Sequence, residues 1–163
     1  EGTCFTVTFE HRIADEECIE LNQELDVLDG KSVLQGKHVL LVEDNELNAE
    51  IAMAILEQSG LILDRVEDGL ACINRLSEVD ADLYDLILMD IQMPNVNGYE
   101  ATRRIRQFKN LKKASIPILA MTANAFEEDK KMAMEAGMNG HISKPIDVNA
   151  LENQIINLFK KVS

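Results

Sequence analysis

The chain of 163 residues contains no tryptophan, two tyrosines and three cysteines, and it has no long run of apolar residues. Because a membrane-spanning helix needs roughly 18 or more consecutive apolar residues, the sequence predicts no direct insertion into a membrane. The first residues also lack the basic and then apolar pattern of a signal peptide, which favours a cytoplasmic location. Cys4, Cys18 and Cys72 lie far apart, so we expect ordinary reduced thiols, neither paired nor bound to metal.

Basic side chains are scarce, with 16 lysines and arginines against 29 acidic residues and a net charge of −13. Proteins that bind nucleic acid hold the phosphate backbone mainly through clustered lysine and arginine, so nucleic acid is not an expected partner. The length and a hydrophobic content of 46% suit one domain with a sizeable core and a short appendage.

The appendage is predicted at the amino terminus, because residues 1–36 carry nine of the acidic side chains and only two basic ones. Gly30, Ser32 and Gly36 are residue types common in loops and lie at its end. We therefore place a tail and linker at 1–36 and the domain at 37–163. Within the tail, alternation over Phe5–Phe9 predicts a short strand, and apolar spacing over Cys18–Leu28 predicts a short amphipathic helix.

From Lys37 onward, short apolar runs alternate with stretches of helical spacing. Runs that are almost wholly apolar are typical of strands buried on both faces of a parallel sheet. Five strands are predicted, the second and fifth on weaker patterns: Val39–Val42, Leu61–Val66, Leu86–Met89, Ile118–Met121 and Gly140–Ser143.

The stretches between these runs have the spacing of helices. Two apolar stripes illustrate it, one made of Leu47, Ile51, Ala54 and Ile55, and the other made of Leu151, Ile155 and Leu158 after Asp147 as the helix N-cap. Five strand and helix units in this order predict an open α/β sheet with helices on both faces.

Residues that follow the apolar runs share a chemical theme. In open parallel sheets the ligand site lies outside the carboxyl ends of the strands, so these side chains are expected to converge on one edge. They are three carboxylates, one hydroxyl and one ammonium: Glu43, Asp44, Asp90, Thr122 and Lys144.

Three carboxylates in one crevice repel each other, and a divalent cation removes that conflict. Since the donors are hard oxygens without histidine or cysteine, they favour Mg²⁺, with Mn²⁺ as the other candidate, over zinc. Mg²⁺ keeps positions for water and a phosphate oxygen, which leaves Asp90 as a nucleophile toward phosphorus. Lys144 and the Thr122 hydroxyl then contact the phosphoryl oxygens.

These residues carry a resemblance to a known family. The sequence from about 37 to 161 resembles the receiver domain of response regulators, especially receivers fused to hybrid histidine kinases. Four motifs carry the resemblance: Val42-Glu43-Asp44-Asn45, Met89-Asp90-Ile91-Gln92-Met93-Pro94 with Gly98, Met121-Thr122-Ala123 and Ser143-Lys144-Pro145.

The resemblance implies a doubly wound, flavodoxin-like sheet of five parallel strands in the order 2-1-3-4-5. It also implies that Asp90 is the phosphoacceptor and that Glu43, Asp44, Asp90 and the backbone carbonyl of Gln92 form the metal site. Thr122 and Lys144 contact the phosphoryl group, and the peptide before Pro145 is a candidate for the cis form. The implied partner is a kinase or phosphotransfer domain that bears a phosphohistidine, while a weak homodimer stays open.

Members of this family switch through the threonine and an aromatic side chain three residues before the lysine. Here that second position is His141, in place of the usual tyrosine or phenylalanine, and a histidine could make the switch sensitive to pH. Residues 2–9 also resemble the last strand of a histidine kinase ATP-binding domain. The fragment therefore resembles part of a hybrid sensor kinase, whose parent chain could be anchored in a membrane.

Two other functions compete with an acceptor that catalyses its own phosphorylation without turning over a separate substrate. A phosphatase that uses an aspartyl phosphate needs an acid two residues after the nucleophile, and Gln92 at that position cannot serve as one. A pseudo-receiver that only binds partners is the main alternative, although such domains typically lack residues of the acidic pocket or the acceptor.

Overall fold

The fold is taken from a computed structural model that describes residues 32–123 and 126–162. The strand predicted at Phe5–Phe9 and the helix predicted at Cys18–Leu28 lie outside these residues. Leu34 falls inside the predicted linker, yet its side chain is buried in the core. The packed unit therefore includes residues before Lys37, and the boundary placed at residue 36 stays a prediction.

Five parallel strands form one sheet in the order β2-β1-β3-β4-β5. Their bounds are β1 His38–Val42, β2 Ile62–Val66, β3 Leu86–Asp90, β4 Ile118–Thr122 and β5 Gly140–Ser143. All five predicted strands are confirmed to within one residue at each end, and the flavodoxin-like order is confirmed as well. The central strands β3 and β4 are buried along their whole length, which explains their continuous apolar runs.

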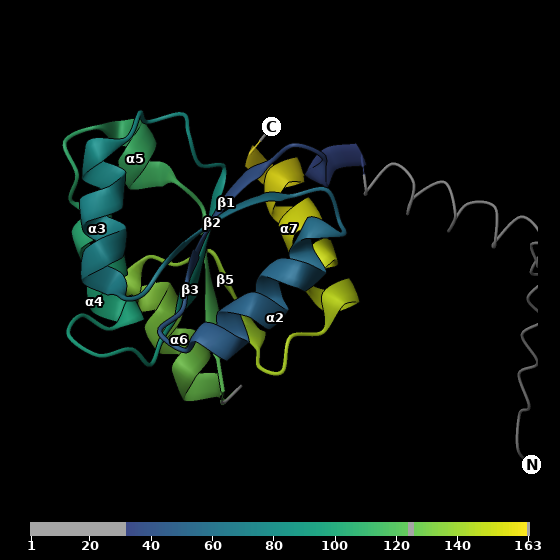
Figure 1. The fold of residues 1–163 in the computed structure, drawn as a ribbon. Helices are drawn as coiled ribbons and strands as arrows, with labels where there is room; N and C mark the ends of the chain where they lie inside the picture. The colour runs from purple at the N-terminus through teal and green to yellow at the C-terminus, as the bar shows by residue number, and fades with distance from the viewer. Residues whose placement is uncertain (1–31, 124–125, 163) are drawn as a thin grey trace, which may run out of the picture.

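Helices cover both faces of the sheet, as Figure 1 shows. One face carries α2 and α7, and the other carries α3, α4 and α6, with α5 as one short extra helix. The bounds are α2 Glu46–Glu57, α3 Gly69–Glu78, α4 Gly98–Arg106, α5 Leu111–Ser115, α6 Glu127–Ala136 and α7 Val148–Val162. None of these helices has the length and apolar character required to cross a membrane.

Capping side chains explain where most of these helices begin. The side chains of Asn45, Asp68, Asn97 and Asn110 each accept a hydrogen bond from a backbone N–H in the first turn of the helix that follows. Asp147 does the same for Ala150, which confirms it as the predicted N-cap of α7. Helix α6 is the exception among the described helices, because its N-cap residue Phe126 makes no side-chain cap hydrogen bond.

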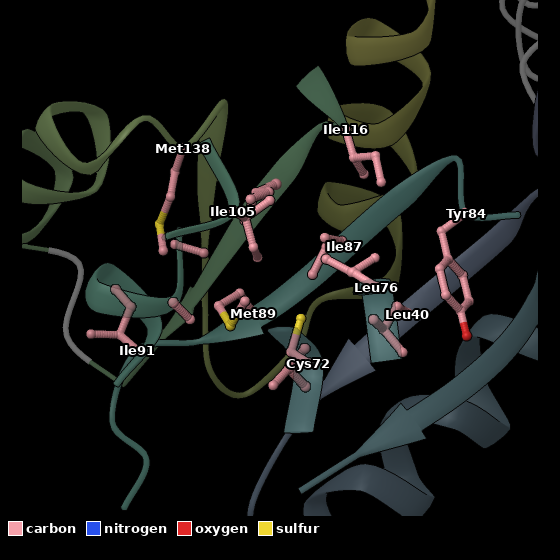
Figure 2. Close-up of a cluster of buried hydrophobic side chains, with 14 of the residues drawn as sticks. Leu40, Cys72, Leu76, Tyr84, Ile87, Met89, Ile91, Ile105, Ile116 and Met138 are labelled. Carbon is pink, nitrogen blue, oxygen red and sulfur yellow. The ribbon is translucent and has the colours of Figure 1, made fainter. Parts of the chain in front are cut away.

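The sheet separates two apolar clusters, one on each face. Figure 2 shows the larger cluster, where Leu40, Ile87 and Met89 of the sheet lie beside Cys72 and Leu76 of α3. Burial raises the pKa of the Cys72 thiol to about 12, so this side chain packs as an inert apolar group. On the other face, α2 and α7 pack against the alternate side chains of β1, β3 and β4. Burial of both faces holds the strand ends rigidly in line.

The apolar stripe predicted for α2 does not face the core. The helix itself is confirmed, but Leu47 is 64% exposed and Ile51 is 53% exposed. Small side chains occupy the buried face, chiefly Ala49 and Ala52, because α2 lies close to the sheet. Leu56 is buried on the same face, whereas Leu47 and Ile51 point to solvent. By contrast, Leu151 and Ile155 in the stripe predicted for α7 are buried as expected.

Arg106, at the end of α4, donates to four acceptor groups from two other segments. Its guanidinium donates hydrogen bonds to the carbonyl oxygens of Gly137, Ala114 and Ile116 and to the Asn139 side chain, at 2.7 to 3.0 Å. Burial lowers its pKa from the usual arginine value. It thus anchors the left-handed end of α6, where Gly137 is the C-cap with φ 96°.

We expect Arg106→Ala to lower the free energy of unfolding by about 2–4 kcal/mol, because several carbonyl groups lose a charged donor. Urea denaturation followed by circular dichroism measures the loss. Arg103→Ala is the matched control, since Arg103 is exposed and has no side-chain partner among the described residues. Equal stability of the two variants would contradict this role for Arg106.

Candidate functional site

The carboxyl ends of four strands meet at one edge of the sheet, and the predicted site residues lie there. Glu43 directly follows β1, Asp90 ends β3, Thr122 ends β4 and Lys144 directly follows β5. Parallel pairing keeps these ends in line, with Val42 opposite Met89, Asp90 opposite Met121 and Thr122 opposite Ser143. The sheet therefore brings the predicted side chains to one place.

Three carboxylates form a compact cluster. Oxygens of Glu43, Asp44 and Asp90 all lie within 4.8 Å of one another. Glu43 is 2% exposed and Asp90 is 6% exposed, whereas Asp44 is exposed at the rim. The cluster thus has a buried floor and one carboxylate open to solvent, an arrangement that a cation can reach from outside.

Lys144 bridges the two buried carboxylates. Its ammonium donates to Oε2 of Glu43 at 2.5 Å and to Oδ2 of Asp90 at 2.6 Å. A single cation thus pairs with two buried anions, and the exposed Asp44 carboxylate adds a third negative charge nearby. The cluster keeps an excess of negative charge that a divalent cation would offset.

The pKa values of Asp90 and Lys144 are shifted both by burial and by the hydrogen bond between the two side chains. Burial raises the pKa of Asp90 above the usual aspartate value, and the hydrogen bond from Lys144 opposes that rise without cancelling it. Burial by itself lowers the pKa of Lys144, but hydrogen bonds to Asp90 and then Glu43 raise it more, so the net shift is upward. Lys144 is therefore a permanent cation at neutral pH.

Backbone geometry shapes the loop after Asp90. The N–H of Gln92 donates to Oδ1 of Asp90 at 3.0 Å, which fixes the carboxylate plane. Gly98 lies against this loop so closely that a Cβ there would be 2.3 Å from the carbonyl oxygen of Asp90. On the far side of the site, the peptide between Lys144 and Pro145 is cis, as the resemblance implied.

Thr122 and His141, the predicted switch pair, lie on the neighbouring strands β4 and β5. Thr122 is buried, and its carbonyl oxygen accepts from the Lys144 N–H at 2.8 Å. His141 is half-buried and lines a cavity of about 140 Å³ beside Lys130 and Gln154. Burial, aided by Lys130, lowers the pKa of His141, so its ring is mainly neutral at pH 7.

Two residues of the site were missed by the sequence reasoning. Asn48 donates to Oε1 of Glu43 at 3.0 Å, and the Arg65 guanidinium donates to the Glu43 carbonyl oxygen at 3.3 Å. Asn48 could have been found from its spacing, because the first turn of a helix that starts after β1 passes over the end of that strand. Arg65 stands near the carboxyl end of β2, next to β1 in the sheet.

Comparison with known proteins gives the family. Residues 39–156 match the family described as response regulator receiver domain. Hybrid signal transduction histidine kinase L of Dictyostelium discoideum is 42% identical over 118 residues, which cover 71% of this chain and 7% of that protein. Histidine kinase 1 of Arabidopsis thaliana is 33% identical over 165 residues, covering 82% of this chain and 14% of that protein.

Solved structures agree with these relatives. The receiver domain of a sensor histidine kinase from Pseudomonas aeruginosa, crystallised with magnesium in its active-site cleft, is 37% identical and has a TM-score of 0.65. The match covers 74% of this chain and 94% of that one. A chain in the co-crystal structure of the Saccharomyces cerevisiae phosphotransfer protein Ypd1 with the Ssk1 receiver domain is 30% identical, with a TM-score of 0.67. That match covers 75% of this chain and 88% of the other.

The chain spans only 7% of the length of the Dictyostelium relative and 14% of the length of the Arabidopsis relative. The aligned region is the part that folds into the five-stranded sheet and carries the acidic cluster. Family match, fold and strand-end residues all point to the same domain of a two-component signalling system. The chain belongs to the response regulator receiver domain family.

Proposed function

We propose that Asp90 of this receiver domain accepts a phosphoryl group from a phosphohistidine, with Mg²⁺ held by Glu43, Asp44, Asp90 and the backbone carbonyl of Gln92. The observation that carries the proposal is the arrangement of Asp90 itself. It is a buried carboxylate that lies within 4.8 Å of two others and 2.6 Å from the Lys144 ammonium. In such an arrangement the carboxylates can hold a metal ion, and the ammonium can contact the oxygens of a phosphoryl group.

The proposed reaction is a displacement at phosphorus. An oxygen of the Asp90 carboxylate forms a bond to phosphorus while the bond between phosphorus and the imidazole nitrogen breaks. The electron pair of that bond stays on the imidazole nitrogen, which takes up a proton. The product is an acyl phosphate on Asp90, and water later hydrolyses it to the carboxylate and inorganic phosphate.

The residues of the cluster suit Mg²⁺. Their side-chain donors are hard carboxylate oxygens, and the cluster contains no histidine or cysteine. The receiver domain from Pseudomonas aeruginosa that was crystallised with magnesium in its cleft adds support. When bound, Mg²⁺ supplies positive charge that offsets both the carboxylates and the oxygens in transfer. Mn²⁺ meets the same requirements for ligands.

Lys144 and Thr122 have complementary roles in the proposal. Lys144 turns from Glu43 toward the oxygens of the phosphoryl group and remains within reach of Asp90. Thr122, at the end of β4, supplies a hydroxyl to the same group. Movement of Thr122 toward the phosphoryl group, together with the ring of His141, then biases the domain toward a second conformation.

A purely partner-binding pseudo-receiver explains these observations less well. Such a domain has no need for the acidic cluster, and yet two of the three carboxylates are buried here at an electrostatic cost. A protein that only binds partners would gain stability from neutral side chains at those positions. Retention of the charges favours the acceptor reaction.

Intact mass spectrometry after incubation with a small-molecule phosphodonor tests the function. With Mg²⁺ present, the wild-type domain is expected to gain one phosphoryl adduct, and excess EDTA is expected to prevent it. No adduct under any metal condition, from a domain whose circular dichroism shows it folded, would contradict the proposal and favour the pseudo-receiver.

Asp44→Ala is expected to lower Mg²⁺ affinity roughly tenfold or more, because one carboxylate ligand at the rim is lost. Titration with Mg²⁺ followed by NMR measures the affinity. Glu46→Ala serves as the control, since it removes the same charge from an exposed position two residues away. Equal loss in both variants would mean that overall charge, rather than a ligand at Asp44, determines the affinity.

The surface beside the cluster suits a protein as phosphodonor. The exposed side chains Leu47 and Ile51 lie on α2, next to a cavity of about 170 Å³ whose lining includes Glu43, Lys144 and Ile146. An apolar surface that borders the acceptor lets a partner dock with its phosphohistidine over Asp90. The yeast co-crystal structure of a receiver domain with a histidine phosphotransfer protein supports this kind of partner.

Ile51→Glu is expected to slow phosphorylation by a phosphotransfer domain roughly tenfold or more, because a charge replaces an apolar contact in the interface. Labelling by a small-molecule donor should be unchanged, since the acceptor site is intact. Ile62→Glu is the control, because Ile62 is 48% exposed at the amino end of β2, the end opposite the site. Equal rates for both variants with the protein donor would contradict docking at α2.

A further inference from the structure

Glu43 is the least exposed carboxylate of the cluster. Both of its side-chain oxygens accept hydrogen bonds, Oε1 from the Asn48 amide at 3.0 Å and Oε2 from Lys144 at 2.5 Å. Its carbonyl oxygen accepts from Arg65, and its N–H donates to Val66. The carboxylate is thus held from two directions by donors of different kinds, one neutral and one charged.

The two donors to Glu43 have different mobility requirements. Lys144 also pairs with Asp90, and in the proposed reaction it must turn toward the phosphoryl oxygens. Asn48 has no such second task among the described residues, and its only side-chain hydrogen bond is the one to Glu43. If Lys144 were the sole donor, the carboxylate of Glu43 could follow the ammonium and leave the position it needs for the metal.

Asn48 is held in place by the start of α2. The side chain of Asn45 caps the helix by accepting from the Asn48 N–H at 3.0 Å. Ala49 follows directly and is buried against the sheet, so the backbone around Asn48 is fixed on both sides. The amide of Asn48 therefore reaches Glu43 from a rigid first turn.

We propose that Asn48 is a positioning residue that holds Glu43 in its place for metal binding while Lys144 changes partner. A neutral amide suits this role because it satisfies Oε1 without cancelling the negative charge that attracts a cation. The inference rests on the proposed function and assigns a role to a residue of α2 that lies outside the strand-end motifs.

The test is the Mg²⁺ affinity of Asn48→Ala, measured by NMR titration. The affinity is expected to fall about tenfold, since a hydrogen bond to a charged group is lost. Alanine favours helix, so α2 should stay folded in this variant. Asn74→Ala is the matched control, because Asn74 lies at an exposed position of α3 and should keep wild-type affinity.

A double-mutant cycle separates positioning from a merely structural role. In a Glu43→Ala background, Asn48→Ala should have no further effect on Mg²⁺ affinity, because there is no carboxylate left to hold. Glu43→Met replaces the alanine variant if the latter does not fold. The same tenfold loss in that background, or wild-type affinity of Asn48→Ala by itself, would overturn the inference.

This outcome is independent of the test of the proposed function. If wild-type protein binds Mg²⁺ but gains no phosphoryl adduct, the acceptor function fails while the affinity comparison still decides the role of Asn48. If the adduct forms normally and the cycle shows no coupling, only the role of Asn48 fails.

Discussion

Asp90→Asn is expected to abolish stable phosphorylation of the domain. The side chain keeps its size and its place at the end of β3, but an amide oxygen does not form an acyl phosphate with phosphorus. The amide can still accept from the Gln92 N–H, as Oδ1 does now, so the loop after β3 should keep its geometry. The expected result is a folded protein without a phosphoryl adduct.

Intact mass after incubation with donor and Mg²⁺ gives the measurement, and thermal unfolding checks the fold. Asp80→Asn is the control, because Asp80 is an exposed aspartate after α3 and should be labelled like the wild type. Undiminished labelling of Asp90→Asn would show that another residue is the acceptor. The acidic cluster would then serve only to bind metal.

The sequence predicts the position of the proposed acceptor because the strand patterns and the location of the site both follow from the burial of parallel strands. Buried parallel strands produce continuous apolar runs, and the polar residue that ends each run marks the edge where ligands bind. Asp90 and Thr122 end the two most buried strands, so their runs are the clearest. The fold and the gathering of the site residues could therefore be predicted from pattern and resemblance.

The sequence could not predict which face of a helix is buried or which side chains form hydrogen bonds between elements. The stripe with Leu47 and Ile51 looked like a core stripe, since periodicity identifies a helix but not the face that is buried. The alanines of α2 allow close packing on the sheet, which leaves Leu47 and Ile51 outside while Leu56 is buried. In the same way, the hydrogen bond from Asn48 to Glu43 depends on side-chain geometry that spacing alone does not specify.

The second large effect is expected from Lys144→Ala, which should slow phosphoryl transfer about 10²–10³-fold. Lys144 is the cation that contacts both buried carboxylates, and in the proposed reaction it stabilises charge on the oxygens in transfer. Mg²⁺ binding should persist, because Lys144 occupies Glu43 and Asp90 in competition with a metal ion. The rate is measured at saturating Mg²⁺ by stopping the reaction at successive times and determining the phosphorylated fraction from the intact mass. Lys131→Ala, at an exposed position of α6, is the control for the loss of one positive charge.

The pH behaviour of Lys144→Ala provides an independent check in metal-free protein. Burial raises the pKa of Asp90, and Lys144 at present opposes that rise through its hydrogen bond and its charge. Removal of Lys144 should therefore raise the pKa of Asp90 further, so the carboxylate takes up its proton at a higher pH than in the wild type. NMR titration of the Asp90 side chain follows this shift. An unchanged pKa of Asp90 together with lost Mg²⁺ affinity would mean that Lys144 supports the fold of the site and does not act on the acceptor.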